Sequence, residues 1–164
     1  MPDQTPVQLA WVTDDLDATE RSLSALLGAR NWVRMPGVHF GPDTCTHRAR
    51  PADYTADISL SYAGDLQLEL IAPGSGDSVY SEFLDRSGPG LHHVCVEVDD
   101  EAAFDAAVAA AADGGATIAA QGVMPGGMRF AYVSDERSGV PYIEIAHIPD
   151  EIRQFFDYVR QQQQ

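Results

Sequence analysis

The same order of residue types occurs twice in this sequence, in "VQLAWVTDDLDATERSLSALLGA" (residues 7–29) and in "GLHHVCVEVDDEAAFDAAVAAAADGGA" (residues 90–116). Each stretch begins with the β-branched and apolar residues typical of a strand, passes through two adjacent Asp residues and continues as an Ala- or Leu-rich helix. Gly28 is a helix-stop signal at the end of the first stretch. The repeated order predicts two copies of one structural unit.

The segments after each stretch extend the repeat. The first is followed by "NWVRM" (31–35), a Pro/Gly/His/Arg-rich loop expected over residues 36–54, then "ADISLSY" (56–62) and "LQLELIAP" (66–73), joined by a hairpin signal. The second is followed by "ATIAAQG" (116–122), "MRFAYVSD" (128–135) and "VPYIEIAHI" (140–148). The sequence therefore predicts an α+β protein of two βαβββ modules.

We expect a single domain over residues 1–164, since 45% apolar residues are enough to bury one core. Module one covers about residues 6–75 and module two about 90–148; the linker 74–89 contains a short helix around residues 79–84. The tail 149–164 places apolar residues at helical spacing and predicts an amphipathic C-terminal helix that docks on the modules, ending in a frayed Gln run. These apolar positions are Ile152, Phe155, Phe156 and Val159.

The formal net charge of −15 comes from 25 acidic and 10 basic side chains, and every basic one is Arg. Such a surface repels nucleic acid and anionic lipid, and a chain without Lys cannot form a Schiff base. No apolar run approaches the roughly 20 residues that cross a bilayer, and the first residues do not resemble a signal peptide. With Cys45 and Cys95 interpreted as free thiols, we expect a cytoplasmic protein without nucleic-acid or membrane partners.

Strand side chains alternate between two faces, which separates core positions from a second, polar set. In "HHVCVEV" the valines face the helices, so His93 faces the other way, and this alternation favours His93 over His92. The same division of the first and last strands of each module leaves a polar set on the face away from the helices: Gln8, Glu69, His93 and Glu144. One amide, one imidazole and two carboxylates would suit one divalent ion such as Zn²⁺, Ni²⁺, Co²⁺, Mn²⁺ or Fe²⁺.

The paired βαβββ units, "GLHHVCVEVDD", "LQLELIAP" and "YIEIAH" resemble the vicinal oxygen chelate superfamily over roughly residues 6–148. This superfamily includes glyoxalase I, methylmalonyl-CoA epimerase, extradiol dioxygenases and bleomycin resistance proteins. The resemblance implies a glyoxalase-like curved sheet around a cavity, and carries the four metal ligands onto Gln8, Glu69, His93 and Glu144. A Gln, Glu, His, Glu set resembles some glyoxalase I enzymes, whereas "FLDRSGPGLHHV" and the "APG" after "LELI" resemble the epimerases.

The resemblance implies a metal-dependent isomerase, epimerase or lyase that removes a proton α to a carbonyl through an enolate or enediolate. Glu144 and Glu69 would be the catalytic bases, with His93 as the anchoring ligand and Gln8 as a weak neutral one. The expected substrate is a small-molecule carbonyl or an acyl thioester, and family analogy implies a homodimer.

Two alternatives stay open. One is an Fe²⁺ extradiol-type dioxygenase, and Gln8 in place of the first His argues against it. The other is a metal-free binding protein; Glu69, His93 and Glu144 argue against it, because a pocket without metal would contain buried carboxylates.

Candidate pocket residues are His39 and Arg48 in the expected loop and Met128, Phe130 and Tyr132 near the penultimate strand, where a solvated loop and core packing are equally good interpretations. An acyl-CoA would also need a basic patch, for which Arg48, Arg50 and Arg129 are the available residues.

Overall fold

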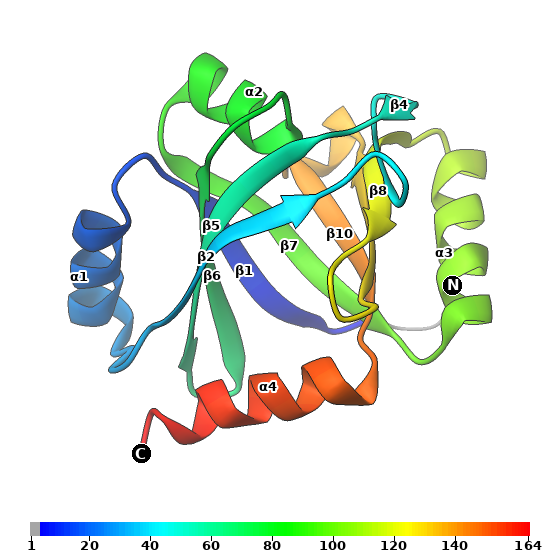
Figure 1. Ribbon diagram of the computed structural model, residues 1–164. Coiled ribbons are helices and arrows are strands. Elements are labelled where there is room, and N and C mark those ends of the chain that lie inside the picture. Colours follow the sequence, from blue (N-terminus) through cyan, green and yellow to red (C-terminus); the bar gives the residue numbers. More distant parts are fainter. Residues whose placement is uncertain (1–3) are drawn as a thin grey trace.

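A computed structural model describes residues 4–164, which form four α-helices and ten strands (Figure 1). The strands are β1 (Pro6–Val12), β2 (Val33–Phe40), β3 (Cys45–His47), β4 (Arg50–Pro51), β5 (Tyr54–Ala63), β6 (Leu66–Pro73), β7 (Gly90–Val98), β8 (Thr117–Val123), β9 (Arg129–Ser134) and β10 (Tyr142–His147). The helices are α1 (Leu16–Leu27), α2 (Val79–Ser87), α3 (Glu101–Asp113) and α4 (Asp150–Gln161), with a 3-10 turn at Glu136–Ser138. The predicted βαβββ order and the linker helix are confirmed.

All ten strands belong to one strongly curled sheet, in the order β2-β5-β6-β1-β7-β10-β9-β8-β3-β4 (Figure 1). The first strands of the two modules, β1 and β7, pair antiparallel at its centre. Each also pairs in parallel with the last strand of its own module, β1 with β6 and β7 with β10. The four strands that carry the candidate ligands are therefore neighbours.

The repeated Asp pair has a local structural role. Its second member is the helix N-cap in both modules: the Asp15 carboxylate accepts a hydrogen bond from the Ala18 N–H (3.0 Å), and that of Asp100 accepts one from the Ala103 N–H (2.7 Å). Gly28 ends α1 in the left-handed conformation with φ 78°, as its sequence position predicts.

The convex face of the sheet packs against α1 and α3. Val96 and Val98 are buried against Phe104 and Ala107 of α3, as the alternation predicts. The concave face encloses an aromatic cluster at one end, where α2 inserts Tyr80 and Phe83. Because each strand alternates, burial of the valines under the helix directs the polar set into the concave interior.

The C-terminal helix α4 crosses the other end of the curled sheet (Figure 1). Its Val159 is fully buried, and its Arg160 guanidinium lies 4.9 Å from the centre of the Tyr62 ring. The predicted docking of this amphipathic helix is confirmed. Helix α4 ends at Gln161, and beyond it the Gln163 amide accepts from the Arg30 N–H (3.0 Å) and donates to the Asn31 carbonyl (2.8 Å).

The expected loop over residues 36–54 is only partly a loop. Strand β2 continues to Phe40, and the short β3–β4 hairpin reaches across to module two, where β3 pairs antiparallel with β8. Gly122 of β8 permits this contact, since a Cβ there would lie 2.6 Å from the Thr44 carbonyl oxygen and 2.7 Å from Cys45 Sγ. The prediction failed because the partner of β3 lies far along the chain, beyond any local pattern.

Gly122→Ala should therefore destabilise the protein by about 1–3 kcal/mol, because β3 must move away from β8 to admit the methyl group. Urea unfolding followed by circular dichroism measures this loss. Gly90→Ala is the control, since a Cβ at Gly90 meets only the Phe83 ring at 3.7 Å. Equal losses in the two variants would contradict a close β3–β8 contact.

Candidate functional site

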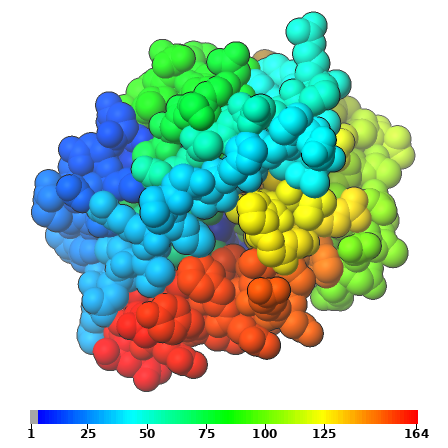
Figure 2. Space-filling model, viewed as in Figure 1, coloured from blue at the N-terminus to red at the C-terminus, as the bar shows by residue number. Residues whose placement is uncertain are grey.

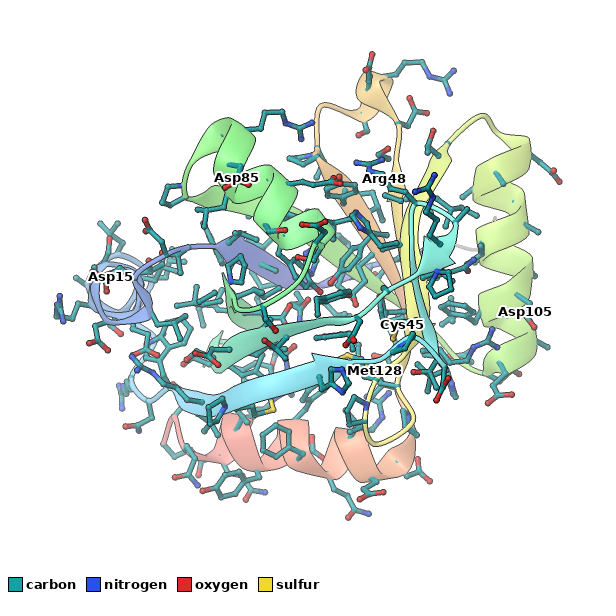
Figure 3. All side chains as sticks on the ribbon, turned by 45° about the horizontal axis from the view of Figure 1, so that its top comes forward. Asp15, Cys45, Arg48, Asp85, Asp105 and Met128 are labelled. Atoms are coloured by element: carbon teal, nitrogen blue, oxygen red, sulfur yellow. The ribbon has the colours of Figure 1, made fainter. Side chains whose placement is uncertain are left out.

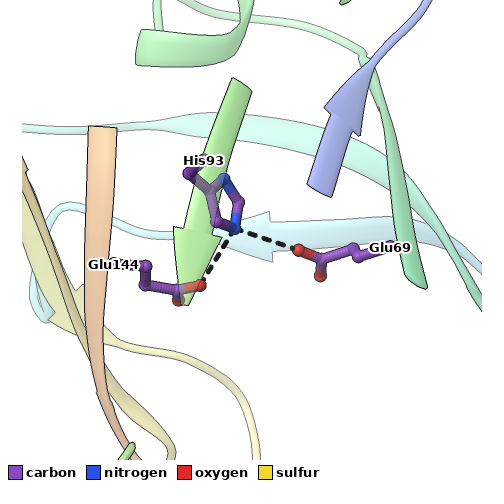
Figure 4. A group of neighbouring side chains, drawn as sticks. All are labelled: Glu69, His93 and Glu144. Carbon is purple, nitrogen blue, oxygen red and sulfur yellow. Dashed lines mark ion pairs between the residues drawn. The ribbon is translucent and has the colours of Figure 1, made fainter. Parts of the chain in front are cut away.

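Four polar side chains from four adjacent strands meet inside the curled sheet. Nε2 of His93 lies 3.0 Å from Glu144 Oε2, 3.2 Å from Gln8 Oε1 and 3.4 Å from Glu69 Oε2 (Figure 4 shows the two carboxylates). His93 is fully buried and Glu144 is 3% exposed. The structure thus brings together all four residues that the sequence pattern selects.

Charge is the dominant property of this cluster. Burial lowers the pKa of His93, but the hydrogen bonds and negative charge of Glu144 and Glu69 outweigh it and raise that pKa to about 9. Burial raises the pKa of Glu69; the His93 hydrogen bond and charge oppose this shift, and the Glu144 charge adds to it. Without a metal, a positively charged His93 is the counter-ion that these buried carboxylates require.

A β-bulge positions His93. Ala10 of β1 pairs with His93 and Trp11 pairs with Leu91, so His92 is an extra residue on β7. The alternation predicts His92 outside and His93 inside, but the bulge turns both inward, and His92 is also fully buried.

The two imidazoles of the bulge contact each other, with 2.9 Å between their Nδ1 atoms. Burial, and then the charge of His93, lower the pKa of His92 well below its ordinary value, so His92 is the neutral acceptor of this pair. Donation from His93 Nδ1 to His92 leaves the lone pair of a neutral His93 on Nε2, directed at the carboxylates.

A chain of amides orients Gln8. Its Nε2 donates to Gln67 Oε1 (2.6 Å), and Gln67 Nε2 in turn donates to the Tyr62 hydroxyl (3.0 Å). This leaves the Gln8 carbonyl oxygen, the amide atom that binds cations, facing His93. The sequence analysis did not select Gln67; its position two residues before Glu69, on the same face of the strand, was the available signal.

The donor set fits a divalent cation. An imidazole nitrogen, two carboxylate oxygens and an amide oxygen converge, and the ligand atoms of Glu69, His93 and Glu144 lie within 4.8 Å of one another. Ligands about 2.0–2.2 Å from a common centre lie about 3.0–3.5 Å apart, which matches the spacing around His93 Nε2. Two carboxylates would neutralise the ion, and the adjacent cavity leaves room for a further ligand.

A cavity of about 150 Å³ opens beside this cluster. Gln8, Glu69 and Glu144 form its polar part. The remaining walls are apolar or aromatic: Met35, Val38, Ile58, Leu60, Tyr80, Met124, Pro125, Met128, Tyr132, Ile152, Phe155 and Phe156. Figure 2 shows a hollow in this region, between β2 in cyan, the β8–β9 turn in yellow and α4 in orange-red.

The candidate pocket residues separate into two groups. Met128 and Tyr132 line the cavity. His39 is exposed and pairs with Asp53, and Phe130 is buried in the aromatic core, so neither lines this cavity.

Arg48 also lies outside the cavity. It pairs with Glu82 of α2 at 2.7 Å, away from Met128, which packs near α4 (Figure 3). The aromatic core and the cavity both lie on the concave side of the sheet. The sequence pattern of β9 therefore shows which side chains point inward, but not which of them reach the core and which reach the cavity.

Sequence reasoning missed Tyr80, which α2 directs into the cavity wall. Its hydroxyl lies 2.6 Å from that of Tyr132, and both side chains are buried. Burial raises the pKa of both tyrosines well above the ordinary value, so both are neutral hydroxyls at physiological pH. One hydroxyl of the pair donates to the other, which leaves a second proton to donate to a neighbouring oxygen.

A curated protein matches part of this chain. One curated relative, the uncharacterized protein YqjC of Bacillus subtilis (strain 168), is 35% identical over 48 residues, which are 29% of this chain and 34% of that protein. The match therefore spans about a third of its length.

Solved structures show the same fold at low sequence identity. Hypothetical protein BH1468 from Bacillus halodurans C-125 superposes with a TM-score of 0.64 at 13% identity, covering 90% of this chain and 96% of that one. Methylmalonyl-CoA epimerase from Mycobacterium tuberculosis gives 0.60 at 18% identity, with 91% of each chain covered. A Streptomyces coelicolor methylmalonyl-CoA epimerase variant, in complex with 2-nitronate-propionyl-CoA, gives 0.54 at 19% identity, covering 88% of this chain and 98% of that one.

A family model connects this fold with the sequence. The model described as Glyoxalase/Bleomycin resistance protein/Dioxygenase superfamily matches residues 7–132, which include three of the four converging side chains. The chain belongs to this superfamily, and the predicted vicinal oxygen chelate relationship is confirmed.

Proposed function

We propose that the protein is a divalent-metal-dependent isomerase, epimerase or lyase that removes a proton α to a carbonyl. The observation that carries this proposal is the convergence of Gln8, Glu69 and Glu144 on His93 Nε2, at 3.0–3.4 Å, next to a cavity. Buried carboxylates without an ionic partner are costly, so their concentration here favours a cation-binding role.

In this proposal His93, Gln8, Glu69 and Glu144 hold the ion. The bound ion would supply a Lewis acid that makes a proton α to a carbonyl easier to remove. His93 contributes a neutral nitrogen whose orientation His92 fixes, and Gln8 contributes an oxygen whose orientation Gln67 fixes.

The proton acceptor is a carboxylate. The C–H bond of the substrate breaks, the proton bonds to an oxygen of Glu144 or Glu69, and the electron pair moves onto the substrate as an enolate. Because the two carboxylates approach His93 from β6 and β10, return of the proton by the other carboxylate would invert the carbon (Figure 4).

The substrate class in this proposal is a small-molecule carbonyl or an acyl thioester.

Homodimer formation and a cytoplasmic location stay predictions. Leu26 and Leu27 of α1 are 75% and 45% exposed, which is consistent with a further contact surface. Cys45 and Cys95 are both free and buried. Within residues 4–164 no helix has the length and hydropathy to span a membrane.

Metal uptake is the first test. Chelator-treated protein, re-equilibrated separately with Zn²⁺, Ni²⁺, Co²⁺, Mn²⁺ and Fe²⁺, should retain about one ion per chain. Glu144→Gln and Glu69→Gln should each weaken binding by at least roughly tenfold, because each replaces an anionic donor with an amide. Elemental analysis after gel filtration measures both effects.

Glu82→Gln is the matched control, since Glu82 also pairs with a base, Arg48, but on the surface away from the cavity. It should bind metal like the native protein. Absence of stoichiometric metal from the native protein would contradict the proposed chemistry and favour a metal-free binding protein.

Proton exchange tests the chemistry itself. Metal-loaded protein in deuterated water should exchange the α protons of at least one of hydroxyacetone, propionyl-CoA and 1-phenylpropane-1,2-dione, as followed by proton NMR. Glu144→Gln should lower this rate by about a hundredfold or more, the usual contribution of a positioned base. Glu82→Gln should leave it unchanged.

Equal exchange rates with and without metal would contradict the proposal. Oxygen consumption by the Fe²⁺ form, in place of exchange, would favour the dioxygenase alternative.

A further inference from the structure

The apolar cavity bears on the substrate class. We infer that the substrate is a small, uncharged carbonyl compound with an apolar substituent, and that α4 selects it against carboxylates and acyl-CoA thioesters. The inference rests on the proposed function and narrows its substrate class.

The first observation is the composition of the cavity wall. Beyond the candidate ligands and the two tyrosines, its lining is aliphatic, sulfur-containing or phenyl. Met35 and Val38 come from β2, Met124 and Met128 from the β8–β9 turn, and Phe155 from α4, so the apolar surface is contributed by every element around the hollow in Figure 2. An apolar substituent gains free energy there and a charged one loses its hydration.

The second observation is the position of the arginines, none of which lines this cavity. Arg48 pairs with Glu82 on the surface, and Arg129 pairs with Asp105 and lies over the Phe104 ring. An acyl-CoA would meet no cation inside the cavity, and its phosphates would approach a chain of net charge −15.

The α4 arginines lie beside the cavity but are paired with carboxylates. Arg153 pairs with Glu97, and Arg160 lies 3.6 Å from Asp65. Both line a neighbouring pocket that shares Gln8, Met128 and Phe156 with the cavity, but neither lines the cavity itself. These ion pairs hold α4 against the sheet, with its phenyl rings facing the cavity.

The third observation is charge balance. Glu69 and Glu144 together neutralise one divalent ion, so a neutral substrate leaves the buried site neutral. Transfer of its proton to a carboxylate keeps the total charge unchanged. A carboxylate substrate would add one negative charge that no side chain of the cavity offsets.

Calorimetric binding to the Zn²⁺-loaded protein tests this inference with three probes. The first is 1-phenylpropane-1,2-dione, which is neutral. The second is phenylglyoxylate, which has the same ring and adjacent carbonyl groups but carries a carboxylate. The third is propionyl-CoA. The neutral diketone should bind at least tenfold more tightly than either anion.

Two variants test the role of the wall. Phe155→Ala should weaken diketone binding about tenfold through lost apolar contact, whereas Gln154→Ala, at an exposed position of the same helix, should not. Val38→Arg places a cation in the wall on the edge strand β2, and should reverse the preference toward phenylglyoxylate. Circular dichroism verifies folding of each variant.

The outcomes separate this inference from the proposed function. Tighter binding of phenylglyoxylate or propionyl-CoA to the native protein, or no binding of any probe, would overturn the substrate class and leave metal-dependent exchange to be judged by its own assays. Diketone binding that is equal in Zn²⁺-loaded and chelator-treated protein supports the apolar selectivity and counts against the metal-dependent function.

Discussion

Burial of two carboxylates beside one imidazole is the constraint on which this structure depends. Glu69 and Glu144 repel each other, and their burial becomes favourable only beside a positively charged His93 or beside a cation that all three side chains bind. The three side chains come from β6, β7 and β10, and Gln8 comes from β1 between β6 and β7. A one-residue slip of any of these strands would turn its polar side chain to the convex face, so the site and the strand register depend on the same pairing.

Much of this arrangement could be predicted from the two-residue alternation of the strands and from the repeat in the sequence. The valines beneath α3 determine the inward face of β7, and equivalent positions in the repeat then select Glu69 and Glu144 without knowledge of any contact. The N-cap role of Asp15 and Asp100 is also local, since an Asp before an apolar helical pattern satisfies the free N–H groups of the first turn. These features depend on short-range alternation and on a repeat that the sequence displays twice.

The features that sequence reasoning missed are those that depend on distant partners. The bulge at His92 is defined by its register against β1, so simple alternation put that imidazole on the wrong face. The residues near the penultimate strand all face inward, but whether they reach the core or the cavity depends on where α2 and α4 lie. For the same reason, the apolar face of α4 predicted that this helix docks on the modules, but did not predict that it lines the cavity. The apolar wall and the charged cluster are therefore adjacent in the folded structure, although no local sequence pattern connects them.

The pairing of β3 with β8 has a consequence for the order in which the protein can form as it leaves the ribosome. The Cys45–His47 segment is made early, yet its partner, Ala120–Gly122, emerges only after module one, the linker and α3 have been synthesised. Until then the β3–β4 hairpin has no neighbouring strand from the second module. Glu144 and α4 come later still, so the charged cluster is completed and its cavity closed only after both have been synthesised. A nascent chain therefore exposes this apolar interior until α4 has been synthesised, and its early half must stay free of aggregation during that interval.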